Sequence, residues 1–306
     1  MEGGRLRLQQ EADQVIKRSA LLLLLISVVV GLVPVWGDPG KASKVTFGRA
    51  HGSFQPRKGK VFVLVIGNDA RNGNPDRSRA DAIHIVGVNT KTMKAGILNF
   101  PRDSWVNIPG SGSGRINEAL YRGGPQLLVK TVESITNIKI DYWVMTGFEG
   151  FQRLIKNIGR VRMYIPKDVY DPTGSGARLK KGGQSLGPIS LLAYVRTRHS
   201  FSTGDFARTE HQGDALIAIL RKLHRDVDRT PGTLLSWIEA VKRHTRLNLD
   251  PVDLFRLGVL ATQMPVKRVG NVTVPGYTGS AGAASVVFLS PSAGRIYARF
   301  KRNASL

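Results

Sequence analysis

The sequence predicts an α/β domain with a central mixed sheet and helices on both faces, an α-β-α sandwich, preceded by one transmembrane helix. Short runs of β-branched and other apolar residues, such as VFVLVIG at 61–67, are typical of strands buried on both faces. Segments with apolar residues at helical spacing alternate with these runs, as expected of an α/β domain. An uncharged apolar stretch near the N-terminus predicts the membrane helix.

This apolar stretch, SALLLLLISVVVGLVPVW at 19–36, is about long enough to cross a hydrocarbon core as a helix. A cleaved signal peptide is the alternative, but the stretch is long for one and the following GDPGKAS has no clear cleavage site. More Lys and Arg precede the stretch than follow it closely, which favours a cytoplasmic N-terminus and a single-pass protein of the cell membrane. The expected parts are a cytoplasmic segment (1–18), an anchor (19–36), a tether (37–59) and an extracytoplasmic domain (60–306) with a core (60–225) and a C-terminal extension (226–306).

The elements of the domain follow from two periodicities, alternation in strands and a spacing of three to four residues in helices. The predicted strands are 61–67, 82–88, 95–100, 142–145, 161–165 and strand-like residues within 272–287. The predicted helices are one around 128–135, then 148–158 ended by Gly159, 188–195, 209–223, one from Thr230, and one from Pro251 with Asp250 as N-cap. A glycine-rich loop, DPTGSGARLKKGG, precedes the helix at 188.

Charge narrows the choice of partners. Lys and Arg number 45 and Asp and Glu 22, a net charge of +23 that attracts polyanions. Nucleic acid, anionic lipid headgroups and phosphate-bearing wall polymers all fit this charge. The chain has no cysteine, which excludes a disulfide framework, a thiolate metal site and a cysteine nucleophile.

Acidic and basic side chains follow the first predicted strand, in GNDARNGNPDRSRADAI. This segment places Asp69, Arg71, Arg79 and Asp81 at strand ends, where ligands of open α/β sheets bind. The intervening loop could fold both carboxylates onto one cation, and such an oxygen site with open positions suits Mg²⁺ that bridges phosphates. Two solvated loop aspartates are the alternative.

Arginines follow two later elements. NFPRDSW places Arg102 and Asp103 after another strand, either as a phosphate ligand with a neighbouring acid or as a structural salt bridge. A guanidinium suits phosphate because it donates two parallel hydrogen bonds and stays charged when desolvated.

The segment YVRTRHSFSTGDFARTEHQ carries Arg196, Arg198, Arg208 and Gln212. We expect Arg196 and Arg198 to lie in an extended stretch, so that both side chains point to the same side and grip one pyrophosphate. A basic surface stretch is the alternative.

The order of these segments is more informative than any one of them. GNDAR, RADAI, FPRDSWVNIPG, RINEAL, KTVESITNIKID, TGFEGF, LAYVRTR and DFARTEHQ follow one another along the chain. The series resembles the LytR-CpsA-Psr family of envelope glycopolymer transferases over about 60–220, with a fainter likeness to around 295. The resemblance implies an enzyme that binds a polyprenyl-pyrophosphate-linked glycopolymer, uses Mg²⁺, and transfers the glycopolymer phosphate to a peptidoglycan hydroxyl.

The resemblance also implies roles for particular residues. Asp69 and Asp81 would be metal ligands, and Asp103 and Asp205 match acidic positions near the site. The residues that would hold the pyrophosphate or its pocket are Arg71, Arg79, Arg102, Arg196, Arg198, Arg208 and Gln212, and the expected catalytic set is Asp69, Asp81, Arg102, Asp103 and Arg198. The chain departs from the family pattern where Ala80 and Ala82 replace hydroxyl residues, Arg115 replaces Lys and His211 replaces Arg.

These residues predict that an acceptor hydroxyl attacks the phosphorus proximal to the sugar while lipid phosphate leaves. The metal and arginines would offset charge on the pyrophosphate, and Asp103 or a metal-bound carboxylate would take the proton. The lipid tail needs an apolar cleft, which the helices at 148–158 and 209–223 could line, although such residues are typical of an ordinary core as well. Expected partners are the lipid-linked glycopolymer, such as wall teichoic acid, together with peptidoglycan and the membrane.

Two other classes of function use the same features. A lipid pyrophosphate phosphatase would need the same metal and arginines, with water as the acceptor. A membrane-tethered, non-catalytic binder of anionic wall polymer would explain the charge, but it gains nothing from Asp69 and Asp81 beside phosphate. A nucleic-acid role is not expected, because the anchor would place the basic surface outside and no helix-turn-helix or aromatic-basic RNA signature occurs.

Overall fold

The computed structural model describes residues 58–70 and 78–306, all within one compact unit, Val45–Leu306. The predicted cytoplasmic segment, membrane anchor and nearly all of the tether lie outside the described residues, and so does Arg71. Within the described part, no helix combines the length and apolar character needed to cross a membrane.

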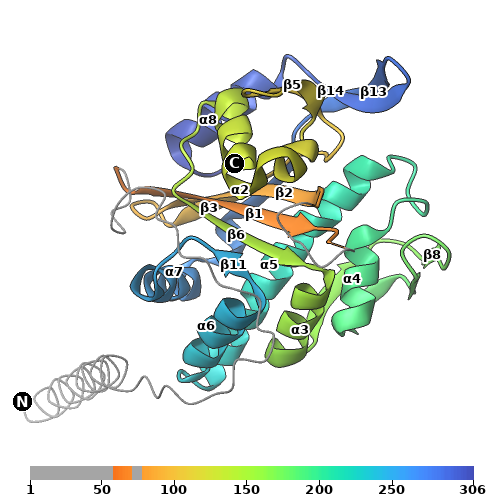
Figure 1. The fold of residues 1–306 in the computed structure, drawn as a ribbon. Coiled ribbons are helices and arrows are strands. Elements are labelled where there is room, and N and C mark those ends of the chain that lie inside the picture. The colour runs from red at the N-terminus through yellow and green to blue at the C-terminus, as the bar shows by residue number, and fades with distance from the viewer. Residues whose placement is uncertain (1–57, 71–77) are drawn as a thin grey trace, which may run out of the picture. The chain divides into compact units, whose positions relative to one another are not determined.

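A six-stranded mixed sheet forms the centre of the domain (Figure 1), which confirms the predicted α/β class. In spatial order its strands are β11 (Arg246–Leu247), β6 (Tyr142–Gly147), β1 (Lys60–Asn68), β2 (Ala80–Asn89), β3 (Lys94–Asn99) and β12 (Val269–Thr273). β1, β2 and β3 are antiparallel neighbours. β6 runs parallel to β1 and β12 parallel to β3, whereas β11 is antiparallel to β6.

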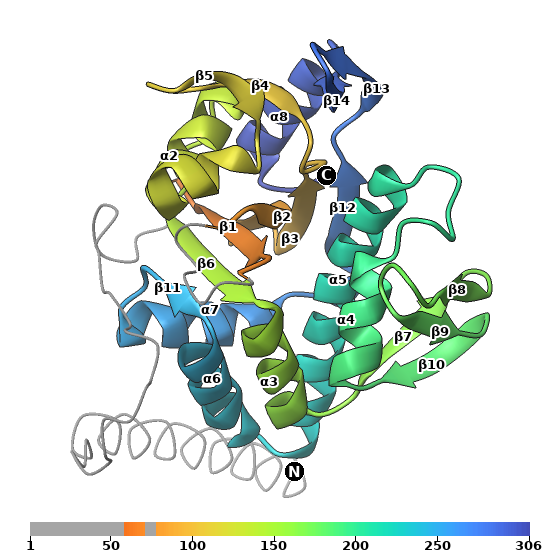
Figure 2. The same ribbon diagram turned by 45° about the vertical axis from the view of Figure 1, so that its right-hand side comes forward.

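Helices cover the sheet on two sides (Figures 1 and 2). One side carries α2 (Glu118–Thr136) and α8 (Ala293–Asn303). The other carries α3 (Phe148–Ile158), α4 (Pro188–Arg196), α5 (Asp205–Arg229), α6 (Thr233–His244) and α7 (Pro251–Gln263).

Alternation along β1 explains both layers, because successive side chains of a strand point to opposite faces. Phe62, Leu64 and Ile66 are buried in the core cluster that includes residues of α2 and α8. Val61 belongs instead to a second cluster, with Leu254 of α7. The continuous apolar run is therefore a strand buried on both faces, as predicted.

Four short pairs of antiparallel strands lie outside the central sheet in the described part of the chain. They are β4 (Trp105–Ile108) with β5 (Gly112–Arg115), β7 (Val161–Ile165) with β10 (Gly182–Leu186), β8 (Val169–Asp171) with β9 (Ala177–Leu179), and β13 (Gly276–Ala281) with β14 (Ala284–Leu289). A single turn of 3-10 helix, Val266–Arg268, precedes β12. The glycine-rich segment predicted as a loop thus contains β9 and the start of β10.

The predicted N-cap of α7 is confirmed, since Asp250 Oδ1 accepts a hydrogen bond of 2.8 Å from the Asp253 backbone N–H. The structure differs from the predictions at several helices. α5 spans Asp205–Arg229 instead of 209–223, and α6 begins at Thr233 instead of Thr230. α2 begins earlier than expected and is kinked at Gly123–Gly124, where Gly124 has φ 67°, a conformation that favours glycine. α8 was not predicted, because only three of its residues are buried within a strongly basic sequence.

Candidate active site

The two predicted metal ligands lie at the same end of the β1–β2 pair. Asp69 directly follows β1, and its Oδ1 accepts a hydrogen bond of 3.0 Å from the backbone N–H of Arg79. The register shifts beside it, so that Gly67 pairs with Ala82 and Asn68 with Ala80. Asp81 is the extra residue of this irregularity, as in a β-bulge, which re-aims a side chain at a strand end. The sequence prediction that both aspartates reach one strand end is confirmed.

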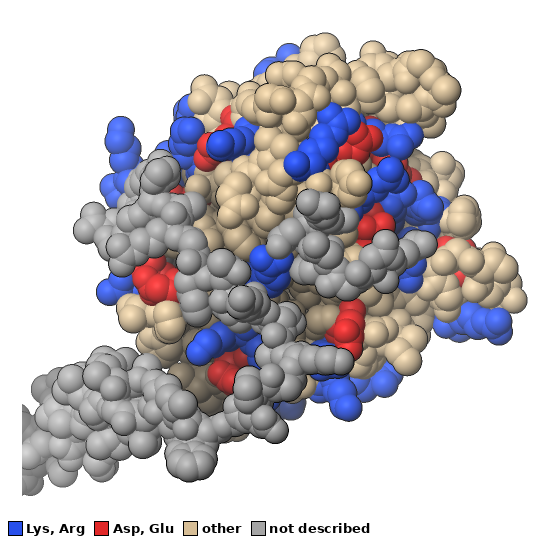
Figure 3. Space-filling model, viewed as in Figure 1, with Lys and Arg blue, Asp and Glu red and all other residues tan. Residues whose placement is uncertain are grey.

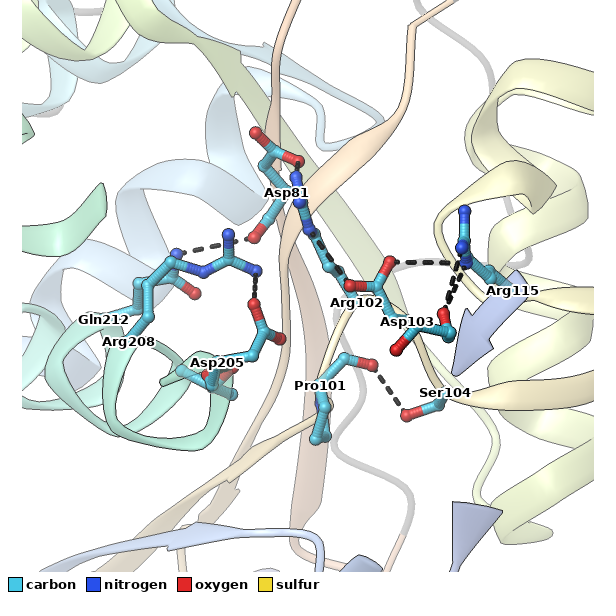
Figure 4. A network of polar contacts seen from close by, with 11 residues as sticks. Asp81, Pro101, Arg102, Asp103, Ser104, Arg115, Asp205, Arg208 and Gln212 are labelled. Carbon is cyan, nitrogen blue, oxygen red and sulfur yellow. Dashed lines mark hydrogen bonds and ion pairs between the residues drawn. The ribbon is translucent and has the colours of Figure 1, made fainter. Parts of the chain in front are cut away.

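Arg102 joins Asp81 to the next loop. Its Nη1 forms an ion pair with Asp81 Oδ1, and its Nε lies 3.6 Å from Asp103 Oδ2 (Figure 4). The other oxygen of Asp103 lies 3.7 Å from Nε of Arg115. Burial acts to lower the pKa of Arg102, but the carboxylates of Asp81, Asp103 and Asp205 outweigh it and raise this pKa. Arg102 is therefore a fixed positive charge among carboxylates at the end of the sheet.

The first turn of α5 adds a buried ion pair. Arg208 Nη2 lies 2.5 Å from Asp205 Oδ1, and the Arg208 side chain is 5% exposed. Burial lowers the pKa of Arg208 and raises that of Asp205. Among the other influences on both pKa values are the charges of Arg102 and Arg198, so these arginines lie near the pair.

The side chain of Gln212 in α5 links this helix to β2 and α4. Its Nε2 donates hydrogen bonds to the carbonyl of Asp81 in β2, at 3.4 Å, and to the carbonyl of Val195 in α4, at 3.1 Å. Figure 4 shows Gln212 and Arg208 reaching from α5 toward Asp81. The structure therefore brings together Asp81, Arg102, Asp103, Arg208 and Gln212, although they come from three distant parts of the sequence.

The prediction of an extended stretch for Arg196 and Arg198 is wrong. Arg196 is the last residue of helix α4, and the chain becomes extended only at Thr197. The Arg196 guanidinium lies 4.4 Å from the centroid of the Phe148 ring. Arg198 instead lies near Asp205 and Arg208, so the two arginines reach the site by different routes. Arg79 is exposed beside Asp69.

Several buried donors and acceptors of this cluster have unfilled hydrogen-bonding capacity. Within the described residues, Arg102 Nε, Arg208 Nε and Asp205 Oδ2 make no hydrogen bond. Buried polar groups are nearly always hydrogen-bonded in native structures, and an unpaired one requires an explanation. Two arginines with free N–H groups in one cluster fit an anionic ligand such as a phosphate group.

An apolar cavity of about 230 Å³ adjoins the cluster between the sheet and the helices α3, α4, α5 and α6. Its apolar wall includes Val65, Phe148, Phe151, Leu154, Leu192, Leu216 and Ile219. Asp81, Arg196 and Gln212 lie on its polar part. Both interpretations of the helices at 148–158 and 209–223 hold, because Phe148, Phe151, Leu154 and Ile219 line this cavity and also pack against a buried core cluster.

The two aspartates also fit a divalent cation. Asp69 Oδ1 accepts a hydrogen bond from the Arg79 backbone, and Asp81 Oδ1 pairs with Arg102. Within the described residues, Oδ2 of each aspartate has no such partner. No third His, Asp or Glu of the described part joins them in a metal-binding group. The remaining ligands would have to be substrate oxygens and water, which is the arrangement that Mg²⁺ prefers in phosphate-handling sites.

Comparison with known proteins decides the family, because residues 38–301 match the model of the LytR_cpsA_psr family. The chain belongs to the LytR-CpsA-Psr family. It is 32% identical over 232 residues to the polyisoprenyl-teichoic acid–peptidoglycan teichoic acid transferase TagT of Bacillus subtilis, covering 73% of this chain and 70% of TagT. It is 30% identical to the regulatory protein MsrR of Staphylococcus aureus, over 71% of this chain and 65% of MsrR.

Solved structures show the same fold. A structure of TagT bound to LI-WTA superimposes with a TM-score of 0.68 at 28% identity, covering 83% of this chain and 93% of TagT. A structure of the LytR-CPS2A-psr family protein YwtF (TagT) with bound octaprenyl pyrophosphate lipid gives a TM-score of 0.64 at 27% identity, with the same coverage. The LytR-CpsA-Psr fold of this chain is thereby established beyond the family model.

Sequence reasoning did not anticipate that the C-terminal hairpin reaches this LytR-CpsA-Psr site. The backbone N–H of Val287 in β14 donates to the carbonyl of Asp103, at 2.9 Å. Arg115 Nη2 donates to the carbonyl of Ser285, also at 2.9 Å. These partners are separated by more than 160 residues and the acceptor in each contact is a backbone carbonyl, so no pair of side-chain motifs signals the contact.

Proposed function

We propose that this chain transfers a phosphate-linked glycopolymer from a polyprenyl-pyrophosphate carrier to a hydroxyl of peptidoglycan. The observation that carries the proposal is the two-part site, in which the buried Arg208 and the half-buried Arg102, each with an unfilled Nε donor, adjoin an apolar cavity. A lipid pyrophosphate has the matching two parts, an anionic head and an apolar tail. TagT is named as a teichoic acid transferase, and its structures contain LI-WTA and octaprenyl pyrophosphate. These names support the proposal that its relative, the present chain, is a glycopolymer transferase.

In the proposed reaction, Arg102, Arg198 and Arg208 hold the pyrophosphate oxygens and the cavity beside Phe148 holds the start of the lipid tail. The acceptor hydroxyl forms a bond to the phosphorus proximal to the sugar. The bond from that phosphorus to the bridging oxygen breaks, and polyprenyl monophosphate leaves. Arginines placed before the reaction stabilise charge without reorganising, which is the largest contribution expected in such a site.

The hydroxyl proton needs an acceptor within reach, and we assign this role to Asp103. Its side chain is 26% exposed and lies beside Arg102, so a hydroxyl from solvent can approach it. Asp205 is more deeply buried, with a side chain 17% exposed that is paired with Arg208. We assign Asp205 to holding Arg208 in place.

We further propose that Asp69 and Asp81 hold Mg²⁺ when the substrate is bound. Bound there, the cation would offset negative charge on the pyrophosphate oxygens. The support comes from the free carboxyl oxygens and from the lack of a third acidic ligand in the described part, which leaves room for phosphate oxygens and water.

Product analysis tests the transfer. Full-length protein in detergent is incubated with the lipid-linked glycopolymer, Mg²⁺ and insoluble peptidoglycan. We expect glycopolymer phosphate to become attached to the insoluble wall with equimolar release of polyprenyl monophosphate. Release of polyprenyl monophosphate with the phosphorylated glycan left in solution would instead identify a phosphatase. Binding of the lipid without any turnover would leave only the non-catalytic binder.

The site must face the wall for this reaction, and we propose that the domain is extracytoplasmic and held by the apolar stretch at 19–36. Protease added to intact spheroplasts should therefore digest the domain. A cytoplasmic protein of the same cells serves as the control for membrane integrity. Full protection of the domain, with digestion only after lysis, would place it inside and contradict the envelope function.

A further inference from the structure

A second, larger cavity lies on the other side of the first turns of α5, and the proposed reaction leaves it without a role. Its volume is about 520 Å³. The wall is built from the end of β7 and the residues after it, from Tyr194 of α4, from the loop before α5, and from α5 itself. Figure 2 shows α4 and α5 beside the paired strands β7 and β10.

The geometry of α5 joins this cavity to the active site. Ala207, Glu210, His211 and Asp214 line the cavity, and their spacing of three and four residues places them along one face of the helix. Arg208 is one position after Ala207, and Gln212 is one position after His211. The same two turns of α5 therefore present one face to the cavity and the neighbouring face to the pyrophosphate cluster.

His211 supplies an unsatisfied polar group in the cavity wall. The residue is 6% exposed, and its Nδ1 makes no hydrogen bond within the described residues. Its ring stacks on Tyr194 with centroids 4.7 Å apart and meets the edge of Phe201 at 4.4 Å. Burial lowers the pKa of His211 to about 4, so at neutral pH the imidazole is uncharged and offers one donor and one acceptor.

The charges that line the cavity are unlike those of the rest of the molecule. Lysines and arginines are spread over the face of the protein in Figure 3, with fewer acidic side chains among them. The cavity instead has two carboxylates, Glu210 and Asp214, against the single lysine Lys167. Asp214 Oδ1 accepts a hydrogen bond of 2.8 Å from the side-chain Nδ2 of Asn271. Carboxylates repel the phosphates of a glycopolymer and accept hydrogen bonds from sugar hydroxyls.

An aromatic side chain at the rim completes a surface suited to sugars. Tyr164 at the end of β7 is 65% exposed and lines the cavity. An exposed aromatic ring offers an apolar face for the C–H face of a sugar and a hydroxyl for its polar edge. Ligand sites of this size commonly combine such apolar surface with a few oriented polar groups.

We propose that this cavity is an acceptor subsite, which holds a neutral N-acetylated sugar of the peptidoglycan strand next to the sugar that is modified. The choice of acceptor over donor rests on the proposed transfer and on the acidic lining, because the donor polymer carries phosphate and the neutral sugar does not. The neutral His211 and the two carboxylates bind hydroxyl and acetamido groups, and Tyr164 stacks on the ring.

The test uses the full-length chain in detergent and chitotetraose, a neutral N-acetylated oligosaccharide, as the probe. We expect Tyr164→Ala and Glu210→Gln each to weaken chitotetraose binding by about tenfold, as expected for loss of one stacking or charge-assisted contact. Tyr277→Ala is the matched control, since Tyr277 is a strand tyrosine that is 61% exposed away from the cavity. Its affinity for the probe should equal that of the wild type.

Two further measurements separate this proposal from the proposed function. In the transfer assay, both variants should raise the half-saturating peptidoglycan concentration while keeping the maximal rate and the affinity for octaprenyl pyrophosphate. Transfer with unchanged acceptor dependence in both variants would overturn the subsite and leave the function standing. A loss of octaprenyl pyrophosphate affinity would assign the cavity to the donor and overturn the proposal too. Chitotetraose binding that depends on both residues in a chain without transfer would support the subsite and refute the function.

Discussion

Replacing Asp81 with alanine is expected to lower Mg²⁺-dependent transfer by roughly a hundred- to a thousandfold, the cost of removing one group that offsets charge in a transition state. Two effects add at this position. The variant loses a proposed metal ligand, and Arg102 loses the carboxylate that forms an ion pair with it. Because both side chains are about one-fifth exposed and Arg102 keeps Asp103 nearby, we expect the fold to survive, as circular dichroism would check.

The Mg²⁺ dependence of Asp81→Asn separates the two effects. A metal ligand predicts a large rise in the Mg²⁺ concentration that gives half-maximal rate, whereas a residue that only positions Arg102 predicts weaker pyrophosphate binding at unchanged Mg²⁺ dependence. Glu239→Ala is the control, since it removes an exposed carboxylate paired with Arg243 within α6 and should leave turnover unchanged. Normal turnover of Asp81→Ala would show that the metal site is misplaced.

Replacing Arg198 with alanine is expected to weaken binding of a short polyprenyl pyrophosphate by about ten- to a hundredfold. The reason is that a hydrogen bond to a charged group is worth about 1.5–3 kcal/mol. Arg198 is partly exposed, so its removal should not unfold the chain as removal of the buried Arg208 could. Arg198→Lys should restore affinity only in part, because an ammonium keeps the charge and loses the planar pair of donors.

Titrations at low and high salt distinguish this role from a general basic surface. Exposed charges contribute about 0–1 kcal/mol and are screened by salt. Arg221→Ala removes an exposed arginine of α5 and serves as the control, with a small, salt-dependent loss expected. If Arg198→Ala behaves like Arg221→Ala, or Arg198→Lys binds like the wild type, the pocket role of Arg198 is refuted.

Local signals predicted most of the first half of the domain. The apolar run at 61–67 and the helical spacing at 148–158 each contain their own periodicity, and the corresponding elements are β1 and α3. The C-terminal part was harder. β11 has only two residues, and β12 (VGNVT) has a glycine and an asparagine among its five, so neither shows a clear period, yet these strands form both edges of the sheet. Their place is fixed by pairing with β6 and β3, which no local pattern encodes.

The candidate active site was also predicted only in part from the sequence. The residue types of Asp69, Asp81, Arg102, Arg208 and Gln212, and the order of their segments, were enough to predict phosphate chemistry. They did not show that Arg196 ends a helix against Phe148, because a helix end depends on what the next residues contact. The pairing of Asp205 with Arg208 and the contact of Arg115 with Ser285 are also set by the tertiary structure.

The sequence by itself determined the fold class, the family and the chemical character of the site, because strand periodicity, charge and an ordered set of motifs are properties of the chain. Only the tertiary structure decided which arginines converge, that an apolar cavity opens beside them, and that α5 divides this cavity from a second one with an acidic lining. The physical reason is that a cavity and its charge belong to surfaces assembled from distant segments. Residues 164, 194 and 211 acquire a common environment only when β7, α4 and α5 pack together.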